Sequence, residues 1–271
     1  MIRTALTLAC LLSSLCLWAS DDKKPSHPSF DYQAAYAHEI KPHRYTIPLK
    51  GVHEGLHQLH LTLTVSPTGE VLDAKADGDA NDLKFWPQIE DEVRRWKFTP
   101  FEENGKPVTA EVEDYVNLAP PERMPEHHVT APVIHPNSKV EISLDRSMCY
   151  GRCPVYKVTI STSGIVYEGD RFVATVGKQT DVADANDVRK LAQKFVDADF
   201  YSMEPVYRAQ VTDNPTFTLS ITIDGRTKKV VDYVGTWIGM PAVISDLEEE
   251  VDAFAHTERW IKSSDTTQPE R

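Results

Sequence analysis

Two cysteines separated by three residues are the side chains with the clearest capacity for chemistry in this sequence. Cys149 and Cys153 enclose Tyr-Gly-Arg and are followed by Pro154. A disulfide requires Cα atoms about 4.4–6.8 Å apart, so the chain between the cysteines must turn, and Gly151 makes a turn easy. Closing so small a loop stabilises a fold by about 2 kcal/mol in the chain-entropy model. The first prediction is a structural disulfide between Cys149 and Cys153.

Other chemistry of the same pair stays open. Arg152 lies beside Cys153, and a neighbouring cation lowers the pKa of a thiol, as a redox-active pair requires. Two thiolates also supply half of a tetrahedral zinc shell, although no partner ligands are evident. Free thiols are the remaining alternative. The competing hypothesis to a structural disulfide is therefore a redox or hydrolytic enzyme centred on Cys149 and Cys153.

Histidines are the second group with possible chemistry, because imidazole binds zinc, copper and nickel. All but one of the ten histidines lie before residue 136. Gly51 and Gly55 indicate a loop around His53, and His60 alternates with apolar residues, which places it on the polar face of a strand. We therefore predict solvated histidines and no metal site, with a metal-binding protein as an alternative.

No catalytic motif occurs in the chain. The nucleophile elbow, the H-E-x-x-H zinc motif, the phosphate-binding loop and the dinucleotide fingerprint are all absent. The run Glu248-Glu249-Glu250 is read as the solvated face of a last helix. The remaining carboxylates of the second half are isolated in sequence: Asp145, Glu168, Asp213 and Asp232. We predict no catalytic residue and no cofactor, which favours a non-catalytic protein.

The first twenty residues have the pattern of a secretory signal peptide. Arg3 precedes an apolar stretch over 6–18, and small residues follow at Ala19 and Ser20. This stretch is shorter than the ~20 residues needed to span a bilayer; an uncleaved anchor or a lipid-modified cysteine are the alternatives. Cleavage removes Cys10 and Cys16 and leaves two cysteines, as expected for one disulfide in an oxidising compartment. The predicted location is periplasmic or secreted.

The charge balance restricts the partners. The chain carries 29 Lys and Arg against 41 Asp and Glu, a net charge of −12. Neutralisation of phosphates needs clustered cations, so we expect no nucleic-acid partner. After signal cleavage no other segment is apolar enough for stable membrane insertion.

Prolines divide the rest of the chain. A length of 271 residues fits about two domains. Residues 21–45 contain three prolines and little periodicity, which predicts a flexible lead-in. Five prolines between 120 and 136 predict a linker over 119–138. The expected domains are 46–118 and 139–262, followed by a disordered tail at 263–271.

The first domain has a β-β-α-β pattern. Apolar residues alternate with polar ones from Leu59 to Val65, and 66–69 form a turn before a returning strand at 70–76. Trp86, Ile89 and Val93 recur at helical spacing, with Asn81 or Asp82 as a possible N-cap. A long last strand is expected over 108–118.

This pattern resembles the C-terminal domain of TonB-like proteins. The resemblance rests on Gly69 in the first hairpin, on the W-x-F-x-P run from Trp96 to Pro100, and on the N-G-K-P-V turn from Asn104 to Val108. It implies a small sheet with a helix on one face and an exposed strand that pairs with an envelope protein or peptide. The chain lacks the retained anchor and long proline-rich segment of TonB, so energy transduction is not implied. The implied partner-binding residues are Val108, Ala110, Val112, Asp114 and Val116.

The second domain has a β-β-β-α-β-β-α pattern. Strands are expected at 140–144, 155–161 and 165–169, and a helix with Asp184 as N-cap follows. Asp224-Gly225 is a strong hairpin signal between strands at 217–223 and 228–234. Pro241 opens a last helix.

This region resembles an uncharacterised family, a domain of unknown function numbered six-four-three-eight. The resemblance rests on the C-Y-G-x-C-P-x-Y run from Cys149 to Tyr156 and on Tyr167-Glu168-Gly169. It implies a fold family and no activity. The sequence thus predicts an α+β protein of two small domains, and an exported, non-catalytic binding or adaptor protein of the bacterial cell envelope.

Overall fold

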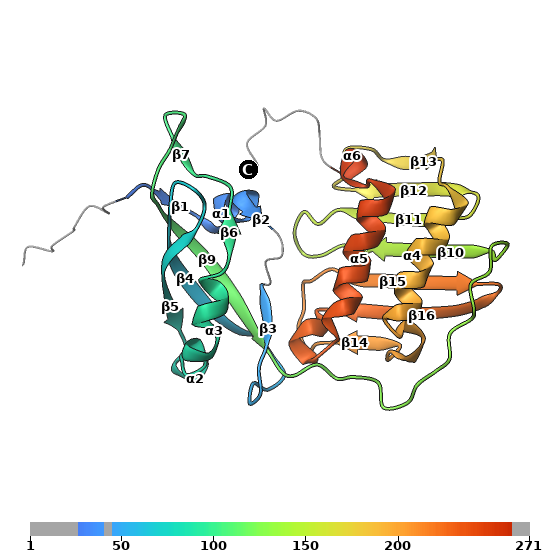
Figure 1. Cartoon of the computed structure of the whole chain (residues 1–271), viewed down its shortest axis with the longest axis horizontal. Helices are drawn as coiled ribbons and strands as arrows, with labels where there is room; N and C mark the ends of the chain where they lie inside the picture. The colour runs from blue at the N-terminus through green and yellow to red at the C-terminus, as the bar shows by residue number, and fades with distance from the viewer. Residues whose placement is uncertain (1–26, 41–44, 262–271) are drawn as a thin grey trace, which may run out of the picture.

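The protein is an α+β chain with two sheet-rich units, each carrying its own hydrophobic core. A computed structural model describes residues 27–40 and 45–261 (Figure 1). The predicted signal peptide at 1–20 and the predicted tail at 263–271 lie outside the described residues. Among the residues that the structure describes, no helix is long and apolar enough to cross a membrane.

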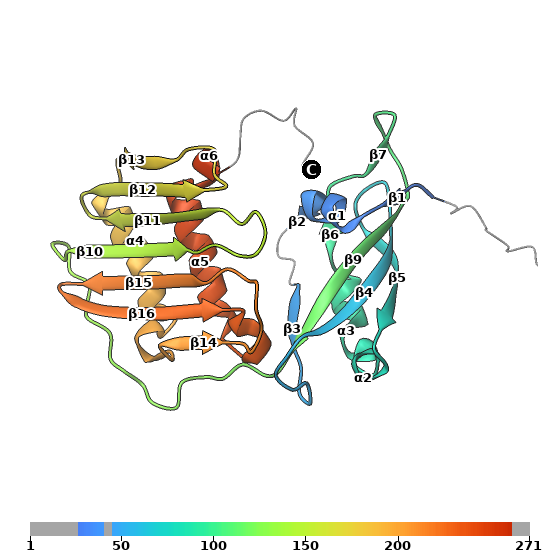
Figure 2. The same ribbon diagram turned by 180° about the vertical axis from the view of Figure 1, so that it is seen from behind.

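The first unit is built around the long strand β9 (Ala110–Ala119). β9 pairs antiparallel with β4 (His57–Val65) along its whole length, and β4 pairs with β5 (Val71–Gly78). One face of this sheet is covered by α3 (Trp86–Val93), which buries Ile89 and Val93 (Figure 2). The short remaining elements of this part are β3 (Thr46–Pro48), α2 (Ala80–Leu83), β6 (Lys97–Phe98), β7 (Glu102–Glu103) and β8 (Lys106–Pro107).

The β-β-α-β order of the first unit agrees with the sequence pattern, with one change at the helix. The N-cap is neither Asn81 nor Asp82. Asp79 instead accepts a hydrogen bond from the backbone N–H of Asn81 at 2.8 Å and caps the short helix α2. A separate helix, α3, then starts at Trp86 with Pro87 in its first turn, where its missing N–H costs nothing.

The predicted flexible lead-in is wrong for residues 29–40. They form β1 (Ser29–Phe30), α1 (Tyr32–His38) and β2 (Glu39–Ile40). Phe30 packs against Phe101 with ring centroids 4.8 Å apart, and Ala35 is fully buried. Asp31 caps α1 by accepting the backbone N–H of Ala34 at 3.0 Å. The segment is too short to show helical periodicity in the sequence, and tertiary packing orders it.

The second unit is a seven-stranded sheet in the order β13-β12-β11-β10-β15-β16-β14. Its strands are antiparallel to their neighbours except for β14, which is parallel to β16. Their bounds are β10 (Val140–Arg146), β11 (Val155–Ser161), β12 (Gly164–Arg171), β13 (Gly177–Asp181), β14 (Val206–Arg208), β15 (Phe217–Ile223) and β16 (Arg226–Tyr233).

Two helices cover one face of this sheet, and no helix of residues 27–40 and 45–261 lies on its other face (Figures 1 and 2). They are α4 (Ala185–Asp197), which Asp184 caps as predicted, and α5 (Ala242–Ala255). Five short elements were not predicted from the sequence. They are β13, β14, η1 (Phe200–Ser202), η2 (Gly235–Ile238) and α6 (Glu258–Ile261). Each has five residues or fewer, too few to reveal a period.

Candidate functional site

A disulfide closes the loop that connects β10 to β11. Cys149 and Cys153 are bonded, with their Cα atoms 5.7 Å apart. The backbone N–H of Gly151 also donates to Sγ of Cys149 at 3.2 Å. The described structure therefore contains the predicted disulfide between Cys149 and Cys153. Within residues 27–40 and 45–261 the structure brings together no group of three or more metal-ligating side chains.

The loop over 147–154 is attached on both sides to the strand ends around it. The backbone N–H groups of Ser147 and Tyr150 donate to the carbonyls of Thr216 (3.0 Å) and Asp213 (3.1 Å). On the other side the guanidinium of Arg152 lies 5.7 Å from the centroid of the Phe172 ring. The Tyr150 side chain makes few packing contacts, since 89% of the residue's surface is exposed. The loop thus presents an aromatic side chain on a fixed backbone.

A polar cluster lies where this loop joins the sheet, at the end of β10 and the start of β11. Asp252 from α5 accepts hydrogen bonds from Arg146 at 2.6 Å, from the Tyr156 hydroxyl at 2.8 Å and from the Thr257 hydroxyl at 2.9 Å. The guanidinium of Arg146 also lies 4.4 Å from the ring centroid of Phe217. These bonds tie α5 to the two strands that carry the disulfide loop. Sequence reasoning missed this cluster, because its members are far apart in the chain.

The motif residues of the second unit gather around the cluster. Tyr156 stacks on Tyr167, and Tyr167 stacks on Trp260 of α6, with centroids 5.5 and 4.7 Å apart. A Cβ on Gly169 would lie 2.2 Å from the carbonyl oxygen of Thr175, so only glycine lets the chain after β12 come this close. Burial raises the pKa of Tyr156 and also that of Tyr167, the latter to about 12. Both phenols are therefore neutral at physiological pH.

The carboxylates of α5 contradict the simple reading of 248–250 as a solvated face. Glu248 is only 4% exposed, and its Oε1 has no hydrogen-bond partner in the described structure. Asp232 from β16, 7% exposed, interacts with it electrostatically. Burial raises the pKa of Glu248 well above its ordinary value, and the nearby Asp232 raises it further. Glu248 is four positions after Ile244 and three before Val251, so it lies on the same buried face of the helix. This spacing indicates burial, but the run of three acidic residues suggests a solvated face instead.

A groove of about 970 Å³ runs along the outer side of α5 and reaches the first unit. Tyr36 of α1 contributes one wall, and Arg146 and Asp252 reach it from the polar cluster. Its other lining residues are Asp246, Glu249, Glu250, Ala253, Thr257, Glu258 and Ile261. The groove is therefore mainly acidic, and it adjoins the polar cluster through Arg146 and Asp252.

The predicted partner-binding strand is not an exposed edge. β9 carries Ala110, Val112, Asp114 and Val116, all of them buried, while Val108 precedes the strand and is half-buried. Opposite β4, the flank of β9 is paired in parallel with β1 at Glu111 and Val112 and with β3 from Asn117 to Ala119. The expectation of an exposed strand over 108–118 is therefore wrong at these positions, because residues 29–30 and 46–48 pair with β9, which no local pattern in the sequence indicates.

Asp114 is a buried carboxyl in the first unit's sheet. Only 4% of it is exposed, its Oδ1 accepts the backbone N–H of Tyr115 at 2.8 Å, and its Oδ2 has no partner in the described part of the chain. Burial raises the pKa of Asp114 to about 7, and the charge of Glu39 adds to the shift. This carboxyl therefore titrates near neutrality.

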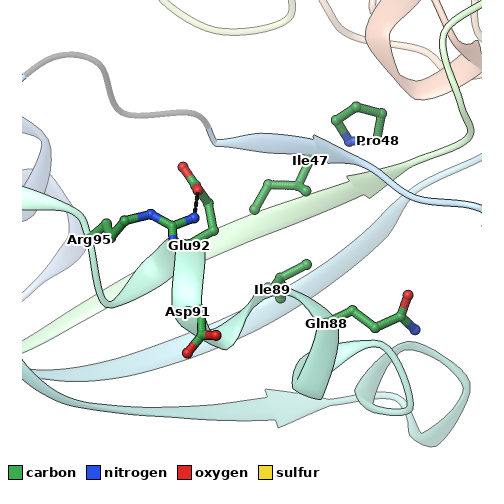
Figure 3. A pocket seen from close by; sticks show the side chains of 7 residues that line it. All are labelled: Ile47, Pro48, Gln88, Ile89, Asp91, Glu92 and Arg95. Carbon is green, nitrogen blue, oxygen red and sulfur yellow. Dashed lines mark hydrogen bonds and ion pairs between the residues drawn. The ribbon is translucent and has the colours of Figure 1, made fainter.

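A second hollow, of about 430 Å³, lies between β3 and α3 (Figure 3). Ile47 and Ile89 face it from the two elements, and Gln88, Asp91 and the ion pair of Glu92 with Arg95 surround it. This arrangement could hold one apolar side chain of a partner. It has no convergent charged groups that would perform chemistry.

Several histidines contact other side chains. Nδ1 of His57 lies 2.7 Å from Oδ1 of the buried Asp82. Nδ1 of His128 lies 3.0 Å from Oδ1 of Asp199, and the His38 ring stacks on Phe101 with centroids 4.3 Å apart. His53 and His60 are exposed.

A comparison with known protein families finds a match in the second unit. This unit is an α+β domain with two helices on one face of a mainly antiparallel sheet. Residues 140–255 match the model of a family described as a domain of unknown function (DUF6438). No curated protein and no solved structure matches the chain. The match supports a fold family for this unit and brings no activity with it.

Proposed function

We propose that the chain is an exported, non-catalytic binding protein of the bacterial cell envelope. In this proposal the second domain contacts a protein partner through the loop 147–154, with Tyr150 as the anchoring side chain. The single observation that carries it is the exposure of Tyr150 on a loop fixed by a disulfide and by backbone bonds to Thr216 and Asp213. An aromatic side chain on a preorganised backbone loses little entropy on binding, and aromatic residues dominate interface hot spots.

Two features support an envelope location. The first is the signal pattern over residues 1–20. The second is the disulfide itself, because disulfides persist in oxidising compartments such as the periplasm. The β-β-α-β core around β9 supports the further proposal that the first domain is TonB-C-like. Strand pairing on β9 would require displacement of β1 and β3, so we place the primary contact on the loop.

The polar cluster supports a binding role over an enzymatic one. Asp252 accepts bonds from three side chains, Arg146, Tyr156 and Thr257, and these bonds hold α5 on the sheet. The neutral phenol of Tyr156 is committed to Asp252. The cluster thus fixes the base of the loop, and its groups face one another rather than a common reaction centre.

The test is site-specific photo-crosslinking in native envelopes. A photoreactive phenylalanine analogue replaces Tyr150 in one strain and Val182 in the other. Val182 is the matched control, since it is 87% exposed and follows β13 at the opposite end of the sheet. A recurrent protein adduct from position 150 alone would support the proposal. Equal adducts at both positions, or none with normal expression, would refute it.

Tyr150→Ala provides the second arm. Because the side chain is exposed, its removal should leave the melting temperature of the chain unchanged, and loss of adduct formation at a neighbouring probe on Met148 then reports binding alone. Met148 is also exposed in the same loop. An unchanged Met148 adduct in the Tyr150→Ala chain would exclude Tyr150 as the anchor.

A further inference from the structure

The first domain touches the second mainly through the short segment 235–242, which begins with η2 (Gly235–Ile238). The backbone N–H of Gly55 in the first domain donates to the Trp237 carbonyl at 3.4 Å, and that of Arg123, in the segment after β9, donates to the Gly239 carbonyl at 2.7 Å. Arg123 also pairs with Glu54 of the first domain. These few polar contacts fix the position of the first domain, so a local change in η2 would alter its docking.

The backbone that leads into η2 is strained. Val234 has φ of 52°, in the left-handed region that β-branched residues avoid. A Cβ on the next residue, Gly235, would lie 2.7 Å from Cβ of Tyr207. The carboxylate of Asp232 holds this turn, because its Oδ1 accepts the backbone N–H of Gly235 at 2.6 Å. Strain of this kind persists only where surrounding contacts impose it.

The carboxyl that holds the turn is buried beside a second one. Asp232 on β16 and Glu248 on α5 are both almost fully buried. Among the described residues, the cation that acts on Glu248 is Arg146 of β10, and Arg146 is already bonded to Asp252 at 2.6 Å. The other charged groups acting on Glu248 are Asp252 and Glu249, both acidic, and the phenol of Tyr207 packs on Gly235 from β14. Negative charge on the pair is therefore poorly compensated.

We propose that Asp232 and Glu248 form a proton-dependent latch, which keeps the first domain docked on residues 235–242 while both are protonated and loosens it once Asp232 ionises. Opening of η2 would expose the ionised Asp232 to water and release Val234 from its left-handed conformation. Hydration of the carboxylate favours the open form only after the proton has left, and relief of the strain at Val234 lowers the cost of opening at every pH. This inference stands on the contacts of η2 and does not depend on the Tyr150 loop.

The titration of the pair gives the direction. Burial raises the pKa of Asp232 from 3.8 to about 6, although the Gly235 N–H opposes the shift. Glu248 retains its proton longer, because burial and then the charge of Asp232 raise its pKa. A carboxyl with a raised pKa stabilises the closed form at low pH, and this contribution is lost as the pH rises through about 6. If opening hydrates Asp232 fully, the docking equilibrium shifts by roughly a hundredfold.

The test measures the radius of gyration of the full chain by small-angle X-ray scattering between about pH 3.5 and about pH 8. The wild-type radius should increase as the pH rises from about 4 and level off above about 6. Asp232→Asn keeps an acceptor for the Gly235 N–H but cannot ionise, so this chain should stay compact throughout. Asp246→Asn, an exposed change on the same helix α5, is the control and should behave as wild type.

Glu248→Gln keeps the proposal testable if Asp232→Asn fails to fold. Glutamine imitates the protonated Glu248, so the step between about pH 4 and about pH 6 should remain, because it belongs to Asp232. A wild-type radius that is constant across this range would overturn the proposal. Persistence of the step in Asp232→Asn, or its loss in Glu248→Gln with retained fold, would also overturn it.

Discussion

Removal of the disulfide should destabilise the second domain without unfolding it. The perturbation is the double substitution Cys149→Ser and Cys153→Ser, which keeps side chains of similar size. The cysteines are four positions apart and half-buried, so little packing is lost. The loss is then the loop-closure entropy of a loop of about five residues, which is about 2 kcal/mol in the chain-entropy model.

The assay is thermal unfolding of the oxidised wild type, the reduced wild type and the double variant. A loss of about 2 kcal/mol in a domain of this size lowers the melting temperature by roughly 6–10 °C. The reduced wild type and the variant should agree, since both lack only the crosslink. Exchange of the Tyr150 amide, which donates to the Asp213 carbonyl at 3.1 Å, should accelerate in both.

One result would refute this reasoning. If the double variant melts with the oxidised wild type and its Tyr150 amide exchanges no faster, the bond is not what holds the loop. A redox role for Cys149 and Cys153 would then become the better hypothesis, and a reduction potential above about −300 mV would support it.

Two further predictions concern the first domain. Gly69→Ala should destabilise it by roughly 3 kcal/mol in urea unfolding, because φ is +84° and a Cβ would lie 1.7 Å from the Phe98 carbonyl oxygen. Gly105→Ala, with φ of +72° and open space around it, should cost only about 1 kcal/mol, and equal losses would contradict the clash argument. Asp114, with a folded pKa of about 7, contributes up to about 4 kcal/mol that is complete below pH ~4 and lost as the pH rises through about 7. Asp114→Asn should flatten the pH dependence of urea unfolding over that range, whereas exposed Glu113→Gln should not.

Much of the fold follows from local patterns. Alternation from Leu59 to Val65 predicts β4, and Asp224-Gly225 predicts the β15–β16 hairpin, where both residues have the positive φ that this turn requires. These signals are local because a strand face or a two-residue turn is read within a few residues. The disulfide was predictable for the same reason, since the two cysteines are close in sequence.

The rest depends on contacts that a single sequence does not display. Asp252 and Arg146 are 106 positions apart, and no local sequence pattern near either residue indicates their hydrogen bond. Residues 29–40 are ordered because Phe30 packs against Phe101 and β1 pairs with β9, and Ala35 is buried as a result. Glu248 is buried although two acidic residues follow it, because α5 turns that side of the helix toward the sheet.

The position of β9 in the first sheet also governs the order in which the chain can fold. In the described part of the chain, β1 and β3 pair with β9 alone, and β4 forms its longer ladder with β9. β9 is the last strand of that domain to be synthesised. A chain that emerges N-terminus first must therefore wait for residue 119 before Leu59, Leu61 and Leu63 can be enclosed. Until then an apolar strand with open edges is exposed, a state that invites aggregation. A chain cut before residue 110 should consequently fail to form this sheet.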